Sequence, residues 1–386
     1  MGNNLNCTCI KSSDEPEIGV STNVIDSNSK LMNVKASHKE TAIENPKEED
    51  KSQRFVKSLQ DRISHETDKS VTVNEITRDK FDKLIESFPH VRGILNTTAS
   101  QLTDLEKESE NNSTLGKIAP VQLSNTKTDE EEYFEGYVNE NGTIEGFGTL
   151  LTQTGNFYKG NFKNNVFNGK GLFINKSGDY YLGNWENGES KGKGELVMKS
   201  GTKYTGDFVE NKKHGTGTEI YNSGEMFEGE FSNNEKIKGK IYFKDGATYC
   251  GDVKNGKITG RGEYKWPDGR KYEGDICEGI IEGNGKTTYP DGSWYEGAYV
   301  DNKKNGKGTF SWVDGKTFTG QWVNNEPNGN GILTMGGVKY DVLFRYGKII
   351  SSKQMGDLEQ QNITDFNKAK NVSDVQPMSA LGAVNI

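Results

Sequence analysis

The residues with the clearest potential for chemistry stand at the start of the chain. Gly2 follows Met1, and Cys7 and Cys9 come shortly after it. A glycine uncovered by removal of the initiator methionine accepts a myristoyl chain, and a nearby cysteine can then be palmitoylated at the bilayer. One myristoyl chain alone binds a membrane only reversibly, so the two cysteines would supply the second attachment. The sequence predicts lipid attachment at Gly2, Cys7 and Cys9, with Asn6 standing where this motif usually has Ser or Thr. The alternative is an ordinary polar N-terminus with two incidental cysteines.

Three other patterns suggest chemistry, but each lacks a required residue. Residues 285–287 read Gly-Lys-Thr, like the end of a phosphate-binding loop, but Ile280 stands where the first glycine is required. Residues 301–306 begin like a calcium loop, yet Lys303 occupies the place of an oxygen ligand. His214 lies in a lysine-rich turn without a nucleophile beside it. We therefore expect no catalytic residue, no cofactor, no metal and no small-molecule substrate.

The charge distribution argues against bulk electrostatic binding. The 386 residues carry a net charge of −8, but residues 134–348 hold 28 basic and 28 acidic side chains, so the acidity belongs to the flanks. A neutral central region provides no basic field for nucleic acid or anionic lipid headgroups. No apolar run is long enough to cross a membrane, and no secretory signal is recognisable. Cys250 and Cys277 stand apart, as expected in a reducing cytoplasm.

The regions outside this centre differ in composition. Residues 1–46 are polar without periodicity and are predicted to be a disordered leader. Within 47–110 we expect short amphipathic helices, whose apolar stripes share one face. These stripes are Phe55, Val56, Leu59 and Ile63; then Ile76, Phe81, Leu84, Ile85 and Phe88, with a stop at Pro89; then Leu102 and Leu105 within Ala99–Glu108. We expect residues 111–133 to be an acidic linker and 349–386 a disordered polar tail.

The central region, 134–348, repeats itself with a period of 22 to 24 residues. It holds 41 of the 47 glycines and nearly all the aromatic residues. Aligned on an aromatic residue followed two positions later by glycine, nine units begin at Phe134, Tyr158, Tyr181, Tyr204, Phe227, Tyr249, Tyr272, Tyr295 and Phe318. Each unit is expected to hold two short strands and two turns, in an array where every unit stacks on its neighbours.

Each unit also keeps the same internal pattern. An apolar residue stands four positions after the start, and a Gly-x-Gly pair and a turn glycine follow. Only the fifth unit departs, with Gly239 read as the first glycine of the pair and Ile241 in the second place. Because alternate residues of a strand share a face, one face reads aromatic, glycine, aromatic, as in Tyr295, Gly297 and Tyr299. The glycines would let rings from neighbouring strands lie flat over the backbone.

These residues resemble the MORN repeat (membrane occupation and recognition nexus). The pattern Tyr-x-Gly-x-Trp/Phe, then Gly-x-Gly, then a turn glycine, covers nine consecutive units, and after Tyr340 a capping strand is expected. The resemblance implies a mostly β fold, a single-layer twisted antiparallel β-hairpin solenoid. It also implies a scaffold without chemistry of its own, at membranes, cytoskeletal structures or cilia.

The function expected from the sequence is a non-enzymatic scaffold at the cytoplasmic face of a membrane. Acyl chains would hold its N-terminus, and the ribbon would recruit protein partners or a second copy of the chain. Rings left accessible on the aromatic face would mark the partner surface, with Trp294, Trp312 and Trp322 as candidates. The alternatives are a cytoskeletal or ciliary component without lipid, comparable to radial-spoke proteins, and a regulatory subunit of an enzyme supplied in trans.

Overall fold

A computed structural model describes residues 71–109, 116–125, 130–138 and 143–355. Three helices lie near the start of this part: α2 (Arg78–Glu86), α3 (Pro89–Thr97) and α4 (Ala99–Ser109). The strands are β1 (Val71–Glu75), β2 (Gly116–Asn125), β3 (Glu130–Val138), β4 (Ile144–Thr152), β5 (Phe157–Lys163), β6 (Val166–Ile174), β7 (Tyr180–Glu186), β8 (Glu189–Val197), β9 (Lys203–Val209), β10 (Lys212–Ile220), β11 (Met226–Ser232), β12 (Glu235–Tyr242), β13 (Thr248–Lys254), β14 (Lys257–Lys265), β15 (Lys271–Cys277), β16 (Ile280–Thr288), β17 (Trp294–Val300), β18 (Lys303–Ser311), β19 (Thr317–Val323), β20 (Glu326–Met335), β21 (Val338–Arg345) and β22 (Lys348–Gln354).

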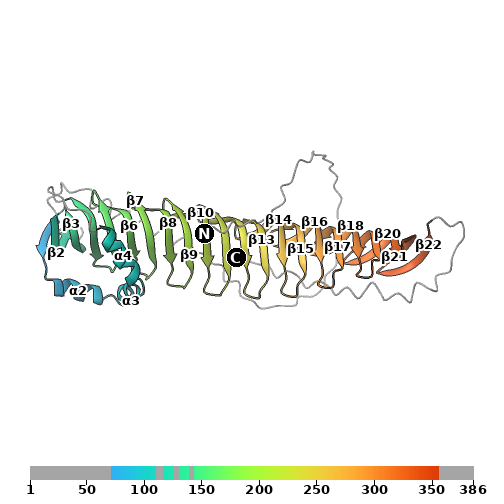
Figure 1. Ribbon diagram of the computed structural model, residues 1–386, viewed down its shortest axis with the longest axis horizontal. Helices are drawn as coiled ribbons and strands as arrows, with labels where there is room; N and C mark the ends of the chain where they lie inside the picture. Colours follow the sequence, from blue (N-terminus) through green and yellow to red (C-terminus); the bar gives the residue numbers. More distant parts are fainter. Residues whose placement is uncertain (1–70, 110–115, 126–129, 139–142, 356–386) are drawn as a thin grey trace, which may run out of the picture.

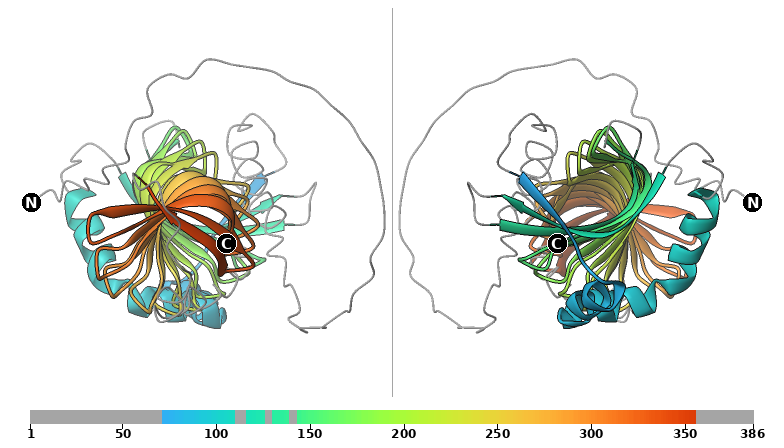
Figure 2. Two further views of the ribbon diagram at one scale, coloured as in Figure 1. Left: turned by 90° about the vertical axis from the view of Figure 1, so that its right-hand side faces the viewer. Right: turned by 90° about the vertical axis from the view of Figure 1, so that its left-hand side faces the viewer.

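All 22 strands belong to one antiparallel sheet, in which each strand pairs with its neighbours in sequence. Figure 1 shows the result, a long ribbon with the helices beside its N-terminal end. Viewed along its length, the sheet twists and curls, so one face is turned inward and the other outward (Figure 2). The predicted fold class, an antiparallel hairpin solenoid, is confirmed.

Each of the nine units is one hairpin, and in the second to ninth units the hairpin is closed by a turn of two residues. Both turn residues have positive φ angles, the mirror-image turn whose twist suits a hairpin. The pairs are Asn164-Asn165, Asn187-Gly188, Glu210-Asn211, Asn233-Asn234, Asn255-Gly256, Glu278-Gly279, Asp301-Asn302 and Asn324-Asn325, with Tyr346-Gly347 in the terminal hairpin. The second residue also joins successive units: Asn234 N donates to Lys213 O at 2.9 Å, and Lys213 N donates to Asn234 Oδ1 at 2.8 Å.

The ring that begins each unit lies over two glycines. Gly274 of β15 pairs with Gly285 of β16, and the ring of Tyr272 covers both. A Cβ atom added to Gly274 would lie 2.5 Å from Tyr272 Oη and 2.4 Å from Gly285 Cα, closer than van der Waals contact permits. The covering ring comes from the same strand, rather than from a neighbouring strand as expected. Where it is tyrosine, its hydroxyl donates to a carbonyl three residues on, as Tyr272 does to Asp275 O at 2.8 Å.

The two glycines of the Gly-x-Gly pair have different roles. The first, such as Gly283 with φ +99°, lies where the register shifts within the hairpin. The second, such as Gly285, lies under the ring. In the fifth unit Gly239 pairs with Gly229 under the ring of Phe227, so Gly239 is the second glycine. The prediction that Ile241 replaces a glycine was therefore wrong: this unit has a shorter bulge and lacks the first glycine.

The inward face forms one continuous aromatic core. Rings of successive units meet edge to face, for example Tyr181 and Phe208 with centroids 4.9 Å apart, and Tyr204 and Phe231 at the same separation. The leading rings of the nine units are buried. The curl of the sheet lets neighbouring units cover one another's rings without a second sheet. The core is thus more closed than the sequence led us to expect.

At the N-terminal end the outward face carries a second apolar core, which the helices cover. Phe81, Val91, Leu102 and Leu105 pack there against Leu151, Phe157, Leu172 and Ile174, forming a second core. Helix α2 begins at the cap residue Thr77, and α2 and α4 lie where the apolar stripes predicted helices. Pro89 begins α3 rather than only ending α2, because proline suits the first turn of a helix.

Other expected boundaries shift. Strand β2 and the start of β3 occupy the segment 111–133 expected to be a linker, and β1 lies in the segment expected to be helical. Strand β2 pairs with both β1 and β3, so the sheet begins before the first repeat. The capping strand after Tyr340 is a hairpin, β21 and β22, that extends to Gln354. The helix expected around Phe55 lies outside the described residues.

Replacing Gly274 by valine should unfold the ribbon locally, because the added side chain would displace the Tyr272 ring and separate the paired strands. We expect a loss of about 3 kcal/mol or more in the free energy of unfolding, combining overpacking with backbone strain. Circular dichroism melting of the full chain would measure it. The exposed Lys303→Ala variant is the control and should melt like the wild type, whereas an unchanged Gly274→Val melt would contradict the ring-over-glycine packing.

Candidate binding surface and buried charged network

The candidate residues from the sequence fall into different environments. Gly2, Cys7 and Cys9 lie outside the described residues. Trp322 is only 1% exposed, and its indole N–H donates to Gly308 O at 3.1 Å. Trp322 thus belongs to the core, and the prediction that it presents a partner surface is corrected. Trp322 stands four positions after the first residue of its unit, and the side chain at this position points inward.

The other two tryptophans are half-buried. The ammonium of Lys286 lies 4.4 Å from the ring centroid of Trp294, on the outward face. Trp312 packs edge to face on Phe310, with centroids 4.8 Å apart. Both keep part of their surface accessible, so they remain candidates for contact with a partner.

Trp312 belongs to a larger set, which we call the edge row. Its members share one place in the repeat, three residues before the turn glycine, where they begin the turn that leads to the next unit. They are Phe243, Trp266, Tyr289 and Trp312 of units five to eight, each half-buried and packed on the core. The backbone of each closes its turn, as when Gly292 N donates to Tyr289 O at 2.9 Å. The repeat alignment places an aromatic residue three positions before the turn glycine in each of these units, but the sequence analysis selected only Trp312 from this set.

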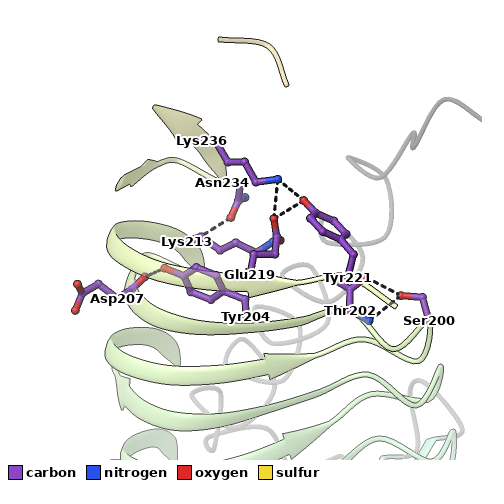
Figure 3. A network of polar contacts seen from close by, with 9 residues as sticks. All are labelled: Ser200, Thr202, Tyr204, Asp207, Lys213, Glu219, Tyr221, Asn234 and Lys236. Carbon is purple, nitrogen blue, oxygen red and sulfur yellow. Dashed lines mark hydrogen bonds and ion pairs between the residues drawn. The ribbon is translucent and has the colours of Figure 1, made fainter. Parts of the chain in front are cut away.

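The core is interrupted in units four and five by a charged network (Figure 3). The carboxylate of Glu219 accepts from Lys213 Nζ at 2.5 Å and lies 3.1 Å from Lys236 Nζ. The hydroxyl of Tyr221 donates to Glu219 Oε2 at 2.5 Å and accepts from Lys236 Nζ. Two ammonium groups and one hydroxyl thus converge on one buried carboxylate.

The network holds Glu219 in its charged form. Burial alone would raise the pKa of Glu219, but the two ammonium groups, together with hydrogen bonds from Lys213 and Tyr221, lower it to about 2. For Lys236, burial lowers the pKa, and the attraction of Glu219 opposes the shift. Burial and the neighbouring carboxylate raise the pKa of Tyr221, so its hydroxyl remains protonated and donates. The arrangement stabilises charge and brings no substrate-accessible nucleophile together with a base.

Unit eight holds a third buried lysine, Lys304, which is 1% exposed. Its Nζ lies among four rings, 4.8 Å from the centroid of Phe310 and 5.3 Å from those of Tyr289, Tyr295 and Trp322. It has no hydrogen-bond partner, and burial lowers its pKa to about 7. Attraction to ring faces offsets only part of the cost of removing an ammonium from water.

Within the described residues, no three His, Cys, Asp or Glu side chains come together as a metal site. Helices α2 to α4 are too short and too polar to cross a bilayer. What the described residues present is a long surface with an edge row of accessible rings.

Fold and surface together define a repeat protein built as an open antiparallel ribbon. A family model described as "MORN repeat" matches residues 158–180, 181–203, 204–226, 249–269, 272–294, 295–317 and 318–336. The chain therefore contains seven MORN repeats between residues 158 and 336. The first and fifth of the nine units lie outside these matches. In the fifth, the shorter bulge and missing first glycine account for the departure.

Among solved structures, the chain is similar to the TCP domain of SAS-4 (dCPAP) of Drosophila melanogaster, determined in complex with a proline-rich motif of Ana2 (dSTIL). The two are 11% identical, the match covers 60% of this chain and 92% of that one, and the TM-score is 0.19. No curated protein matches the chain.

Removing the charge of Glu219 should be costly, because Lys213 and Lys236 would be left buried without a counterion. We expect Glu219→Gln to lower the free energy of unfolding by about 3 to 5 kcal/mol at pH 7. The wild type should lose this stabilisation as pH falls from 4.5 toward 2, since the folded pKa lies below the unfolded one. Melting between pH 2 and 7 measures both effects. Equal stability of variant and wild type at pH 7 would show that the network contributes nothing.

Lys304 should give the opposite pH dependence. Its folded pKa of about 7 lies below the ordinary 10.5, so the unfolded chain binds more protons between these values and stability rises with pH. From pH 7 to 9.5 we expect a gain of about 3 kcal/mol. Lys304→Met should be more stable than the wild type at pH 7 and should lack this gain. Chemical denaturation at several pH values measures the free energy of unfolding of both proteins. If it rises equally with pH in the wild type and in Lys304→Met, Lys304 is not the group responsible.

Proposed function

We propose that this protein is a non-enzymatic scaffold that recruits protein partners along its ribbon while acyl chains on Gly2, Cys7 and Cys9 hold it at the cytoplasmic face of a membrane. The MORN repeat is a repeat-based scaffold for protein binding. The observation that carries the proposal is the unbroken pairing of 22 strands, which presents one long surface with several equivalent places for contact.

The membrane part of the proposal is supported by the sequence. Gly2 follows Met1 and the two cysteines lie close behind it, as acylation requires, with Asn6 in the place where the motif usually has Ser or Thr. The ribbon offers no alternative means of attachment through charge, because its basic and acidic side chains balance. Lysines on its surface are frequently paired with acids, as Lys271 is with Glu263 at 3.3 Å and Glu273 at 3.0 Å. Attachment through lipid chains is therefore favoured over attachment through the repeats.

Changing the acceptor residues should release the protein. Gly2→Ala should move it to the cytosol, because palmitoylation requires prior residence at the membrane. Cys7→Ser with Cys9→Ser should leave weak, reversible binding, since a single myristoyl chain gives an association constant of only about 10⁴ M⁻¹. Cell fractionation and fluorescence imaging measure both. The matched control is Cys250→Ser with Cys277→Ser, which should behave like the wild type.

Two results would overturn the membrane proposal. If Gly2→Ala still sediments with membranes, lipid attachment at this glycine is not what holds the protein there. If wild type and variant both label the cytoskeleton or cilium, the alternative of a structural component without lipid is correct.

A further inference from the structure

Two buried polar atoms in units seven and eight lack hydrogen-bond partners. They are Lys304 Nζ and Tyr289 Oη, the two such side-chain atoms among the described residues. Buried polar groups are almost always paired, because leaving one unpaired costs free energy. Two unpaired donors near one another indicate a missing acceptor.

The same arrangement occurs, complete, three units earlier. Lys236 and Tyr221 are separated by 15 residues, as are Lys304 and Tyr289, and each pair occupies the same places in the repeat. Between the earlier pair lies Glu219, whose carboxylate contacts both Lys236 Nζ and Tyr221 Oη. The earlier units therefore show how one carboxylate can bind both the lysine and the tyrosine that occupy these two places of the repeat.

The chain supplies no carboxylate to the later pair from either equivalent place. The counterpart of Glu219 in unit seven is Thr287, whose hydroxyl is hydrogen-bonded to Tyr299 at 2.6 Å. A carboxylate six residues after the lysine, in the relation of Glu219 to Lys213, would have to stand at Phe310, which forms part of the ring cage. Both places are occupied by residues that cannot accept as a carboxylate does.

The cage reaches the surface on one side. Tyr295, Phe310 and Trp322 are at most 2% exposed, whereas Tyr289 is half-buried and belongs to the edge row. Rotation of the Tyr289 ring would therefore open the cage with least disturbance of the core. The charges of Arg270 and Asp291 act on the Tyr289 hydroxyl in opposite directions, and Arg270 is paired with Asp268 at 2.6 Å, so these groups add little net field on this side.

We propose that Lys304 and Tyr289 bind one carboxylate of an acidic residue from a partner protein, which enters at Tyr289 and takes the position that Glu219 holds in unit four. This inference rests on the proposed function only in requiring that the ribbon bind protein. Lys304 Nζ and Tyr289 Oη both donate to the incoming carboxylate, and a charged pair replaces an unpaired ammonium.

The edge row makes a protein segment the fitting source of this carboxylate. Successive members lie two strands apart, about 10 Å along the ribbon. Three residues of a peptide in the polyproline II conformation cover about the same distance, and they bring the side chain back to the same face. A segment laid along the row would place its acidic residue at Tyr289 and apolar residues three positions to either side, near Trp266 and Trp312. A small free anion would lose its water without gaining these apolar contacts.

The first experiment supplies the carboxylate from within. Thr287→Glu with Tyr299→Phe reproduces the Glu219 and Phe231 of the complete network. Lys304, followed by ¹⁵N NMR of its Nζ in the full chain, should then titrate well above its present pKa of about 7. Tyr299→Phe alone is the control and should leave the titration unchanged. Unchanged titration in the folded double variant would overturn the proposal, because the carboxylate would not reach the ammonium.

The second experiment supplies the carboxylate from outside. The probe is the blocked peptide Gly-Trp-Ser-Ser-Glu-Ser-Ser-Leu-Gly, compared with the same peptide carrying Gln for Glu, by calorimetric titration of the full chain. The Glu peptide should bind about tenfold more tightly, as expected for a hydrogen-bonded charged pair. The preference should disappear in Lys304→Met and in the double variant, and persist in Lys303→Ala.

Three outcomes would overturn the proposal: equal binding of the two peptides, binding of neither, or a preference for Glu that survives in Lys304→Met. If sodium acetate removes the Glu preference at millimolar concentration, the site takes small free carboxylates and the assignment to a protein segment is wrong. These measurements are made in solution, so they are independent of whether Gly2 is acylated in cells.

Discussion

The close approach of an aromatic ring to two backbone segments is the interaction on which the rest of the ribbon depends. A ring such as Tyr272 can lie over its own strand and the next one only if both positions beneath it lack a Cβ, and Gly274 and Gly285 meet this condition together. The ring then contacts rings of adjoining units from within a single sheet. Burial of the core and stacking of the units both depend on this contact.

An aromatic core of this kind also admits lysine. The inward place at the start of the second strand is occupied by Ile281 in one unit and by Lys213, Lys236 and Lys304 in others. Long apolar stems fill space among the rings, and the ammonium group must then find compensation. In units four and five Glu219 provides it, whereas in unit eight ring faces alone surround the charge. The repeat thus has places where polarity can be introduced without loss of the fold, and these are the places where one unit can differ functionally from the next.

The sequence allowed the repeat boundaries, the hairpin in each unit, the buried face and helices α2 and α4 to be predicted, because each depends on local periodicity. It did not reveal β1 and β2, whose pairing depends on contacts across the helical segment, nor the cover of Leu151 and Leu172 by helices. The prediction of an accessible Trp322 was wrong because a single-layer ribbon has no second sheet to cover its aromatic face, and the curl that buries this ring is not evident from the sequence. The Glu219 network was missed because its two lysines lie six and 17 residues from Glu219 in the sequence, and each of these three looks like an ordinary surface charge until the strand register is known.

Because each strand pairs only with its neighbours in sequence, the number of units can change during evolution without altering the pairing of the other strands. A duplication or deletion of one hairpin leaves every other strand with the partners it had, while changing both the separation and the angular phase between sites on either side. Because the sheet twists, the edge row would turn around the axis as it lengthens. A protein built in this way can act as a ruler, in which the count of hairpins between two bound partners sets how far apart they are held and which way they face.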